Sequence, residues 1–186
     1  MAEGVPVGVE IQPIAETRAE LLREEMSVPS GRVVVTGLGA VTPLGLDVAS
    51  SWAAAVAGKS GAGPITLFDA SEFDTRIACE VKDWDPTVYL DRKEVRHTDR
   101  CVQFAIGAAM QALQDASFEI TPDNAADIGV VVGTGVGGIG TLSEQFKVLS
   151  ERGPSRISPF LVPMFITNMT SGQVSIVTGA RGPNFT

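Results

Sequence analysis

The strongest structural signal in this 186-residue chain is a run of apolar residues with helical spacing between positions 102 and 113. Apolar side chains that recur at intervals of three and four residues fall on one side of an α-helix and form a wide stripe. Another part of the protein has to cover such a stripe, so it predicts a helix at the centre of a packed domain. The stripe consists of Val102, Ala105, Ile106, Ala109, Met110 and Leu113.

Short apolar segments alternate with further helical patterns along the rest of the chain. Residues 33–35 and 127–132 are typical of strands buried on both faces, and residues 76–81 also fit a strand. Strands that alternate with helices predict an α/β fold with a mostly parallel sheet covered by helices. We expect the other helices to follow Asp47, to span 139–150 and to span 163–178 with an end at Gly179, and a new strand to begin at Asn184.

Residues 1–31 differ from the rest of the chain in composition and form an acidic extension and linker. Six Glu and two Arg in residues 1–30 account for half of the net charge of −8. Residues 16–26 fit a short amphipathic helix, so this extension is either a mobile leader or a docked helix. A balance of 22 acidic against 14 basic residues argues against non-specific nucleic-acid binding. We expect the folded domain to span residues 32–186, with no membrane-spanning segment.

The glycines at 133, 135 and 138 satisfy the spacing G-x-G-x-x-G directly after a predicted strand. This spacing is the fingerprint of dinucleotide-binding folds, which also need an acidic residue after the next strand to hold the ribose. Residues 158–163 follow instead, and they are apolar and flanked by prolines. The sequence therefore favours glycines that serve close packing or a substrate channel over a nucleotide site.

Two cysteines and one histidine limit the chemistry that the chain can carry out. Cys79 and Cys101 have no spacing typical of disulfides or metal sites, so a cytoplasmic location is expected and no metal site is predicted. With His97 as the single histidine, neither a zinc site nor an internal Ser-His-Asp triad is expected. Cys101 lies beside Arg100 and is the closer match to a reactive thiol. For both cysteines we nevertheless favour a small hydrophobic residue that is buried or semi-buried.

Basic residues gather between positions 92 and 100 of this acidic chain. Arg92, Arg96 and Arg100 are spaced by four, which would place them on one face of a helix. Lys93 and His97 lie between them. This group is either a solvated face with acidic neighbours or a docking surface for an acidic partner.

Six blocks of residues follow one another in a fixed order between positions 32 and 186. They are 32–45 (RVVVTGLGAVTPLG), 81–86 (VKDWDP), 133–138 (GTGVGG), 158–163 (SPFLVP), 168–169 (NM) and 181–183 (RGP). Together they resemble the β-ketoacyl-[acyl-carrier-protein] synthases, most closely the elongating type II enzymes of bacterial fatty-acid synthesis.

The resemblance implies the N-terminal half of a thiolase-like layered fold (αβαβα), usually found as a homodimer. Members of the family are acyltransferases that receive an acyl chain from acyl carrier protein on a cysteine and extend it with malonyl-carrier protein under decarboxylation, in fatty-acid or polyketide synthesis. The substrates are carried on phosphopantetheine, and no separate cofactor is implied. By resemblance the nucleophile lies a few residues beyond Thr186, so we expect residues 1–186 alone to be inactive.

The resemblance also suggests roles for individual residues. Val136, Leu161 and Ile166 match positions that line the acyl-chain pocket, although Leu161 stands where an aromatic residue is frequent. Lys93, Arg96 and Arg156 match the basic patch that docks carrier protein, and His97 falls where the family often has a base. The resemblance thus favours docking over a solvated face.

Two other functions remain open. One is a non-catalytic partner subunit of a synthase that resembles a chain-length factor, in which the nucleophile is replaced. The other, which the missing acidic residue disfavours, is a nucleotide-binding oxidoreductase.

Overall fold

The computed structural model describes residues 31–186, of which residues 36–186 form one compact unit. Residues 1–30, with the helix predicted at 16–26, lie outside the described residues. Residues 33–35 are extended and exposed, and Val33 is 94% accessible to solvent. The prediction of a strand buried on both faces is therefore wrong for these residues, because no strand in the described part of the chain pairs with them.

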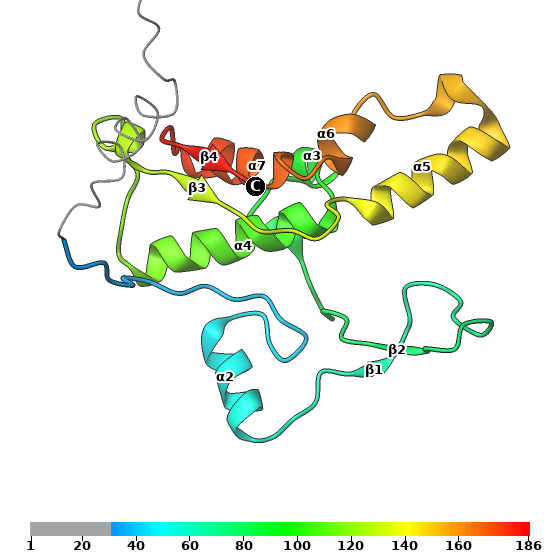
Figure 1. The fold of residues 1–186 in the computed structure, drawn as a ribbon, viewed down its shortest axis with the longest axis horizontal. Coiled ribbons are helices and arrows are strands. Elements are labelled where there is room, and N and C mark those ends of the chain that lie inside the picture. The colour runs from blue at the N-terminus through cyan, green and yellow to red at the C-terminus, as the bar shows by residue number, and fades with distance from the viewer. Residues whose placement is uncertain (1–30) are drawn as a thin grey trace, which may run out of the picture. The chain divides into compact units, whose positions relative to one another are not determined.

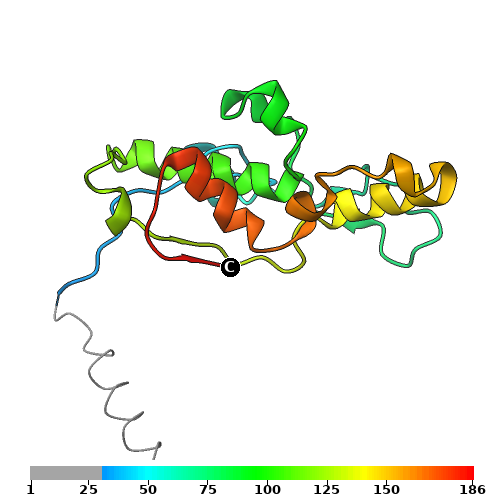
Figure 2. The same ribbon diagram turned by 90° about the horizontal axis from the view of Figure 1, so that it is seen from above.

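The centre of the compact unit is helix α4 (Arg100–Asp115), which the apolar stripe predicted. Val102 and Ile106 of this helix are fully buried and belong to one core cluster with Val174 of α7 (Met169–Thr178). Figures 1 and 2 both show α7 lying along α4. Complete burial of an aliphatic side chain stabilises a protein by about 1.5–3 kcal/mol. The contact between α4 and α7 is therefore a main source of apolar stabilisation in this unit.

Residues 37–46 run along α4 and are bound to it by a polar side chain of the helix. The side chain of Gln111 accepts a hydrogen bond from the backbone N–H of Ala40 at 3.1 Å and donates one to the carbonyl of Leu46 at 2.8 Å. The segment lies so close to the helix that a Cβ on Gly39 would overlap the backbone of Ala108. A glycine is needed here because of this close approach.

The strands are short and occur in two separate pairs. β3 (Val130–Val131) pairs in parallel with β4 (Asn184–Phe185), and β1 (Gly63–Pro64) pairs with β2 (Ile77–Ala78) in antiparallel orientation. The described residues thus contain the strands predicted near 76–81, 127–132 and 184, but not the mostly parallel sheet. Val131 is 78% exposed while Val130 packs against the core, so β3 is buried on one face and not on two.

Most predicted helices are present with their predicted ends. α2 (Val48–Val56) begins after Asp47, whose carboxylate accepts a hydrogen bond from Ser50 N–H, and Gly58 follows it with a φ of +66°. α5 spans Ile139–Arg152.

In the part of the chain that the structure describes, no helix combines the length and apolar character that crossing a bilayer requires. The shorter helical elements are η1 (Pro86–Val88), α3 (Arg92–Val95), η2 (Ala125–Asp127) and η3 (Pro154–Arg156).

The helix predicted at 163–178 is interrupted. The structure has α6 (Leu161–Phe165) and then α7, which ends at Gly179 with a left-handed φ of +82° as predicted. At the break, the carbonyl of Phe165 accepts a hydrogen bond from the N–H of Gly138 at 3.0 Å instead of one from its own helix. A contact with a distant glycine loop therefore accompanies the interruption, and the local sequence pattern does not indicate it.

The close approach of residue 39 to α4 gives a test of this packing. We expect Gly39→Ala to lower the free energy of unfolding by about 2–3 kcal/mol, because overpacking forces the backbone apart. Gly63→Ala is the matched control, since a Cβ there would meet only the Lys82 ammonium at 3.9 Å. Urea unfolding of both variants measures the difference. Equal midpoints for the two variants would contradict the contact.

Candidate functional site

A single buried carboxylate, that of Asp99, holds the first turns of two helices. Asp99 is the N-cap of α4 and accepts a hydrogen bond from the N–H of Cys101 at 3.0 Å. Its second oxygen accepts from Thr141, at 3.2 Å from the backbone N–H and 2.6 Å from the hydroxyl. Because α5 follows Gly138, which has no side chain, Asp99 supplies the cap for this helix from 42 positions away.

The C-terminal end of the glycine loop (residues 133–138) packs directly onto α6. Besides the hydrogen bond from Gly138 N–H to the Phe165 carbonyl, a Cβ on Gly138 would overlap the carbonyl oxygen of Met164. Gly137 has a φ of +75°, and a Cβ there would lie 2.6 Å from the Phe165 oxygen. The loop can make this contact only because these residues are glycines.

This contact places the three predicted acyl-pocket residues on two joined segments. Val136 lies in the glycine loop and is 56% exposed. Leu161 opens α6 and Ile166 directly follows it, and both are half-buried. The structure thus joins the elements that carry these residues, while their role in binding an acyl chain stays a prediction.

The same geometry argues against a nucleotide site. A dinucleotide fingerprint uses free backbone N–H groups at the start of the helix to bind pyrophosphate. Here Gly138 N–H is bonded to Phe165, and Thr141 N–H is bonded to the carboxylate of Asp99. A negative charge already occupies the start of α5, so it would repel a phosphate.

The basic residues near position 96 do not form one helical face, so that prediction is wrong. α3 has four residues and its C-cap is Arg96, and Asp99 then starts a new helix. Arg92 therefore lies on a different helix from Arg100, which donates to the carbonyl of Val81 and lies over the ring of Phe104. Arg100 thus has structural partners.

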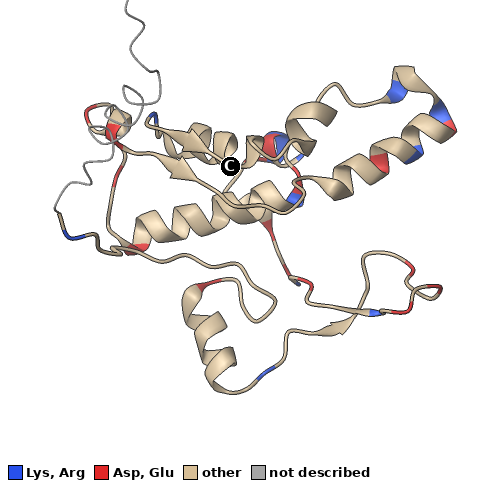
Figure 3. Cartoon of the chain, in the orientation of Figure 1, with Lys and Arg blue, Asp and Glu red and all other residues tan. Residues whose placement is uncertain are grey.

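Lys93 and Arg96 are exposed at α3, whereas Arg156 is exposed in η3. Figure 3 shows basic residues at α3 and a separate group where α5 ends, so the structure does not bring the three predicted docking residues into one cluster. Asp91 caps α3, and its pKa is lowered by the hydrogen bond from Glu94 N–H and further by the nearby Lys93 and Arg96. This carboxylate stays ionised beside the two bases and reduces their net positive charge.

His97 has a partner that the sequence does not indicate. Its imidazole stacks on the ring of Phe160, with 3.8 Å between ring centroids and 19° between the planes. The stack connects the turn after α3 with the residue that caps α6. The two residues are far apart in the sequence, and no local pattern pairs them.

Comparisons with known proteins agree with these features. The family model for the N-terminal domain of β-ketoacyl synthases matches residues 30–186. The chain is 51% identical over 153 residues to the 3-oxoacyl-[acyl-carrier-protein] synthase 2 of Synechocystis sp. and also to that of Coxiella burnetii, which is 82% of this chain and 37% of each relative. The chain belongs to the β-ketoacyl synthase family.

Solved structures of ketosynthases share the fold of this β-ketoacyl synthase domain. The ishigamide ketosynthase/chain length factor has a TM-score of 0.71 at 28% identity, over 81% of this chain and 38% of that one. A β-ketoacyl synthase from Burkholderia phymatum has a TM-score of 0.66 at 25% identity, over 83% of this chain and 38% of that one. The expected thiolase-like α/β fold, in its N-terminal part, is confirmed.

Neither cysteine of this synthase domain has the surroundings of a nucleophile. Cys101 is near the start of α4, but partial burial and the neighbouring Asp99 raise the pKa of its thiol to about 11. Cys79 is exposed, so its predicted burial is wrong, and it lines an apolar cavity of about 500 Å³ with Trp52 and Lys59. Among residues 31–186, no cluster of His, Cys, Asp and Glu is arranged to hold a metal ion.

The double cap made by Asp99 predicts a large loss of stability when it is removed. We expect Asp99→Ala to lower the free energy of unfolding by about 2–4 kcal/mol, because each lost cap costs about 1–2 kcal/mol. Asp99→Asn should lose less, since the amide keeps one acceptor oxygen. Asp47→Ala removes the cap of α2 alone and is the matched control, with a smaller loss. Urea unfolding checks the ranking, and an equal loss for Asp99→Ala and Asp47→Ala would show that only one cap matters.

Proposed function

We propose that this chain is part of a β-ketoacyl-[acyl-carrier-protein] synthase, an acyltransferase that elongates acyl chains in fatty-acid or polyketide synthesis. The observation that carries the proposal is the family match over residues 30–186, which includes both the glycine loop and α6. The 51% identity to 3-oxoacyl-[acyl-carrier-protein] synthases supports it. The chain spans about 37% of the length of these relatives, so the reaction is proposed for the protein of which these residues are a part.

In the proposed reaction, a cysteine thiolate attacks the thioester of acyl-carrier protein and releases the carrier. Malonyl-carrier protein then loses carbon dioxide, and the resulting carbanion attacks the acyl-enzyme and displaces the cysteine. Cys101 does not fit this role, because a thiol with a pKa of about 11 is protonated near neutral pH. We assign the nucleophile to neither Cys101 nor Cys79, and the residues of this chain serve to bind and orient substrates.

Two groups of residues would do this binding. Val136, Leu161 and Ile166 would line the pocket for the acyl chain, where the close contact between the glycine loop and α6 fixes their spacing. Lys93 and Arg96 at α3, with Arg156 on a separate element, would dock the acidic carrier protein.

We propose no cofactor beyond the phosphopantetheine arm of the carrier, and we propose a homodimer. Both cysteines of the described residues are free thiols, which fits a cytoplasmic location.

One solved structure that is similar in fold suggests an alternative function. The ishigamide ketosynthase/chain length factor is similar in fold, so a non-catalytic partner subunit is the alternative. The two functions differ in whether the protein itself accepts an acyl group on a cysteine.

The assay that tests the proposal supplies acyl- and malonyl-carrier protein to the whole protein and follows both carbon dioxide release and the β-ketoacyl product. A synthase forms an acyl-enzyme in the absence of malonyl-carrier protein, and mass spectrometry detects the added acyl mass. We expect both the acyl-enzyme and the product. Absence of both, with product restored only when a catalytic subunit is added, would establish the partner subunit instead.

The docking assignment predicts a specific kinetic change. The double variant Lys93→Glu with Arg96→Glu should raise KM for carrier protein about tenfold and change kcat by less than about twofold, because charge reversal at the surface weakens encounter and binding. Lys59→Glu with Lys82→Glu, two exposed lysines away from α3, gives the same change in net charge and is the matched control. The assignment fails if both double variants raise KM equally, since the effect would then follow net charge alone.

A further inference from the structure

The stack between His97 and Phe160 joins the two groups of residues that the proposed function uses. His97 directly follows Arg96 at the docking face, and Phe160 directly precedes Leu161 at the acyl pocket. We propose that His97 is a positioning residue that couples carrier-protein docking to the choice of acyl chain length through its stack on Phe160. The proposal rests on the function proposed above.

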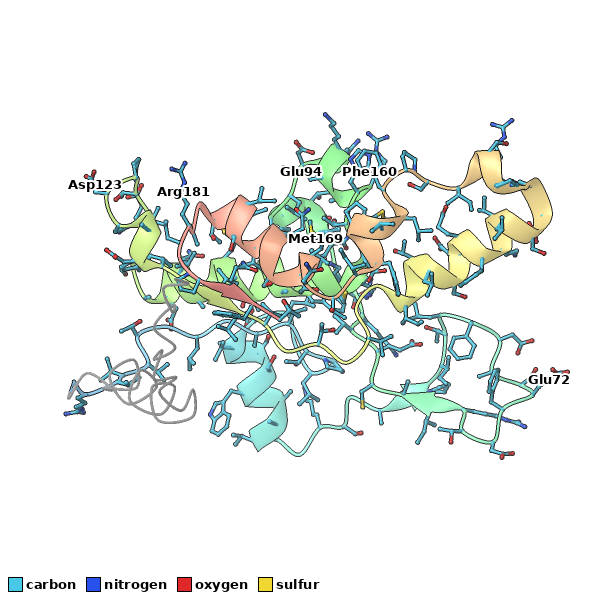
Figure 4. All side chains as sticks on the ribbon, turned by 45° about the horizontal axis from the view of Figure 1, so that its top comes forward. Glu72, Glu94, Asp123, Phe160, Met169 and Arg181 are labelled. Atoms are coloured by element: carbon cyan, nitrogen blue, oxygen red, sulfur yellow. The ribbon has the colours of Figure 1, made fainter. Side chains whose placement is uncertain are left out.

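On one side of the stack, His97 shares its surroundings with a docking residue. His97 and Lys93 line the same cavity of about 190 Å³, together with Glu94 and with Gln173 of α7. Figure 4 labels Glu94 of α3 and Phe160, the residue before α6. A carrier protein that contacts Lys93 would therefore also press on the element that holds the imidazole of His97.

On the other side of the stack, Phe160 is connected to the pocket residues through the backbone. Phe160 caps α6, and its carbonyl accepts a hydrogen bond from the N–H of Met164 at 3.0 Å. The end of α6 is fixed in turn, because the Phe165 carbonyl accepts from Gly138 N–H. A displacement of the Phe160 ring would therefore tilt α6, and with it Leu161, against the glycine loop.

The stack lies outside the apolar core, so its loss can be separated from loss of the fold. Phe160 is 41% exposed and His97 is half-buried, and neither is a member of the core cluster around α4 and α7. The elements on both sides have supports of their own. Gln103 donates to the carbonyl of Val95 at 3.2 Å, and Gln145 accepts from the N–H of Ser158 at 2.7 Å. Removal of the stack should change the relative position of α3 and α6 while each stays folded.

The test separates the effect of a ring at position 97 from the effect of a positive charge there. The variants, made in the whole protein, are His97→Phe, which keeps a stacking ring, His97→Lys, which places a charge at this position without a ring, and His97→Ala. Phe160→Leu removes the partner ring and keeps an apolar side chain. Phe73→Ala removes one ring of a remote pair with Phe68 and is the matched control. The readouts are the Kd for carrier protein, the length distribution of the β-ketoacyl products, and the urea midpoint.

We expect His97→Ala, His97→Lys and Phe160→Leu to shift the length distribution of the products in the same direction. We expect His97→Phe to keep the wild-type length distribution. In a double-mutant cycle, each single variant should raise the Kd for carrier protein. The double variant of His97→Ala and Phe160→Leu should raise it by about threefold less than the product of the two single increases. If the effects multiply, or if His97→Lys and not His97→Phe restores the products, the coupling is absent and His97 acts by charge alone. A wild-type protein that neither binds carrier protein nor condenses would instead refute the proposed function.

Discussion

The carboxylate of Asp99 is the interaction on which the arrangement of this domain depends. One oxygen accepts a hydrogen bond from Cys101 N–H in the first turn of α4, and the other accepts from the backbone N–H and the hydroxyl of Thr141 in the first turn of α5. The N-cap of α5 is Gly138, which has no side chain to accept a hydrogen bond from the first turn of the helix. The carboxylate of Asp99 therefore supplies the cap for α5. The glycine loop is thereby fixed at its C-terminal end, and Gly138 then meets α6 through the Phe165 carbonyl. These contacts in this way fix the position of the proposed acyl-pocket residues relative to helix α4.

The parts of the fold that were predictable from the sequence are those in which the deciding interaction is local. The apolar stripe of α4 repeats at helical intervals, and the caps at Asp47 and Gly179 act within a few residues of the positions where they occur. The missing ribose acid favoured close packing or a substrate channel over a nucleotide site for the loop glycines. Close packing is confirmed for Gly138, which contacts Met164 and Phe165, whereas a Cβ at Gly133 or Gly135 would meet no neighbouring atom. The resemblance to β-ketoacyl synthases depended on ordered blocks of residues and was confirmed by the family match.

Most of the features that sequence reasoning missed depend on partners far along the chain. Residues 33–35 have the composition of a buried strand, but strand formation requires a neighbour to complete the hydrogen-bond ladder, and the described residues offer none. The interruption between α6 and α7 is accompanied by a hydrogen bond from Gly138 N–H to the carbonyl of Phe165, and the partner ring of His97 lies 63 positions away. Spacing by four among the arginines predicted one helical face, whereas the cap at Asp99 divides the segment between two helices.

The basic face at α3 shows why the number of charges alone does not define a docking surface. A helix of four residues is too short to be stable by itself, because the cost of nucleation exceeds the gain from so few hydrogen bonds. The capping box of Asp91 and Glu94 stabilises the start of α3, and Gln103 donates hydrogen bonds to the carbonyls of Val95, the last residue of the helix, and of Thr98 after it. The negative charge of Asp91 also reduces the net positive charge of this face. His97 adds a planar ring to this face, and its stack on Phe160 connects the turn after α3 with α6.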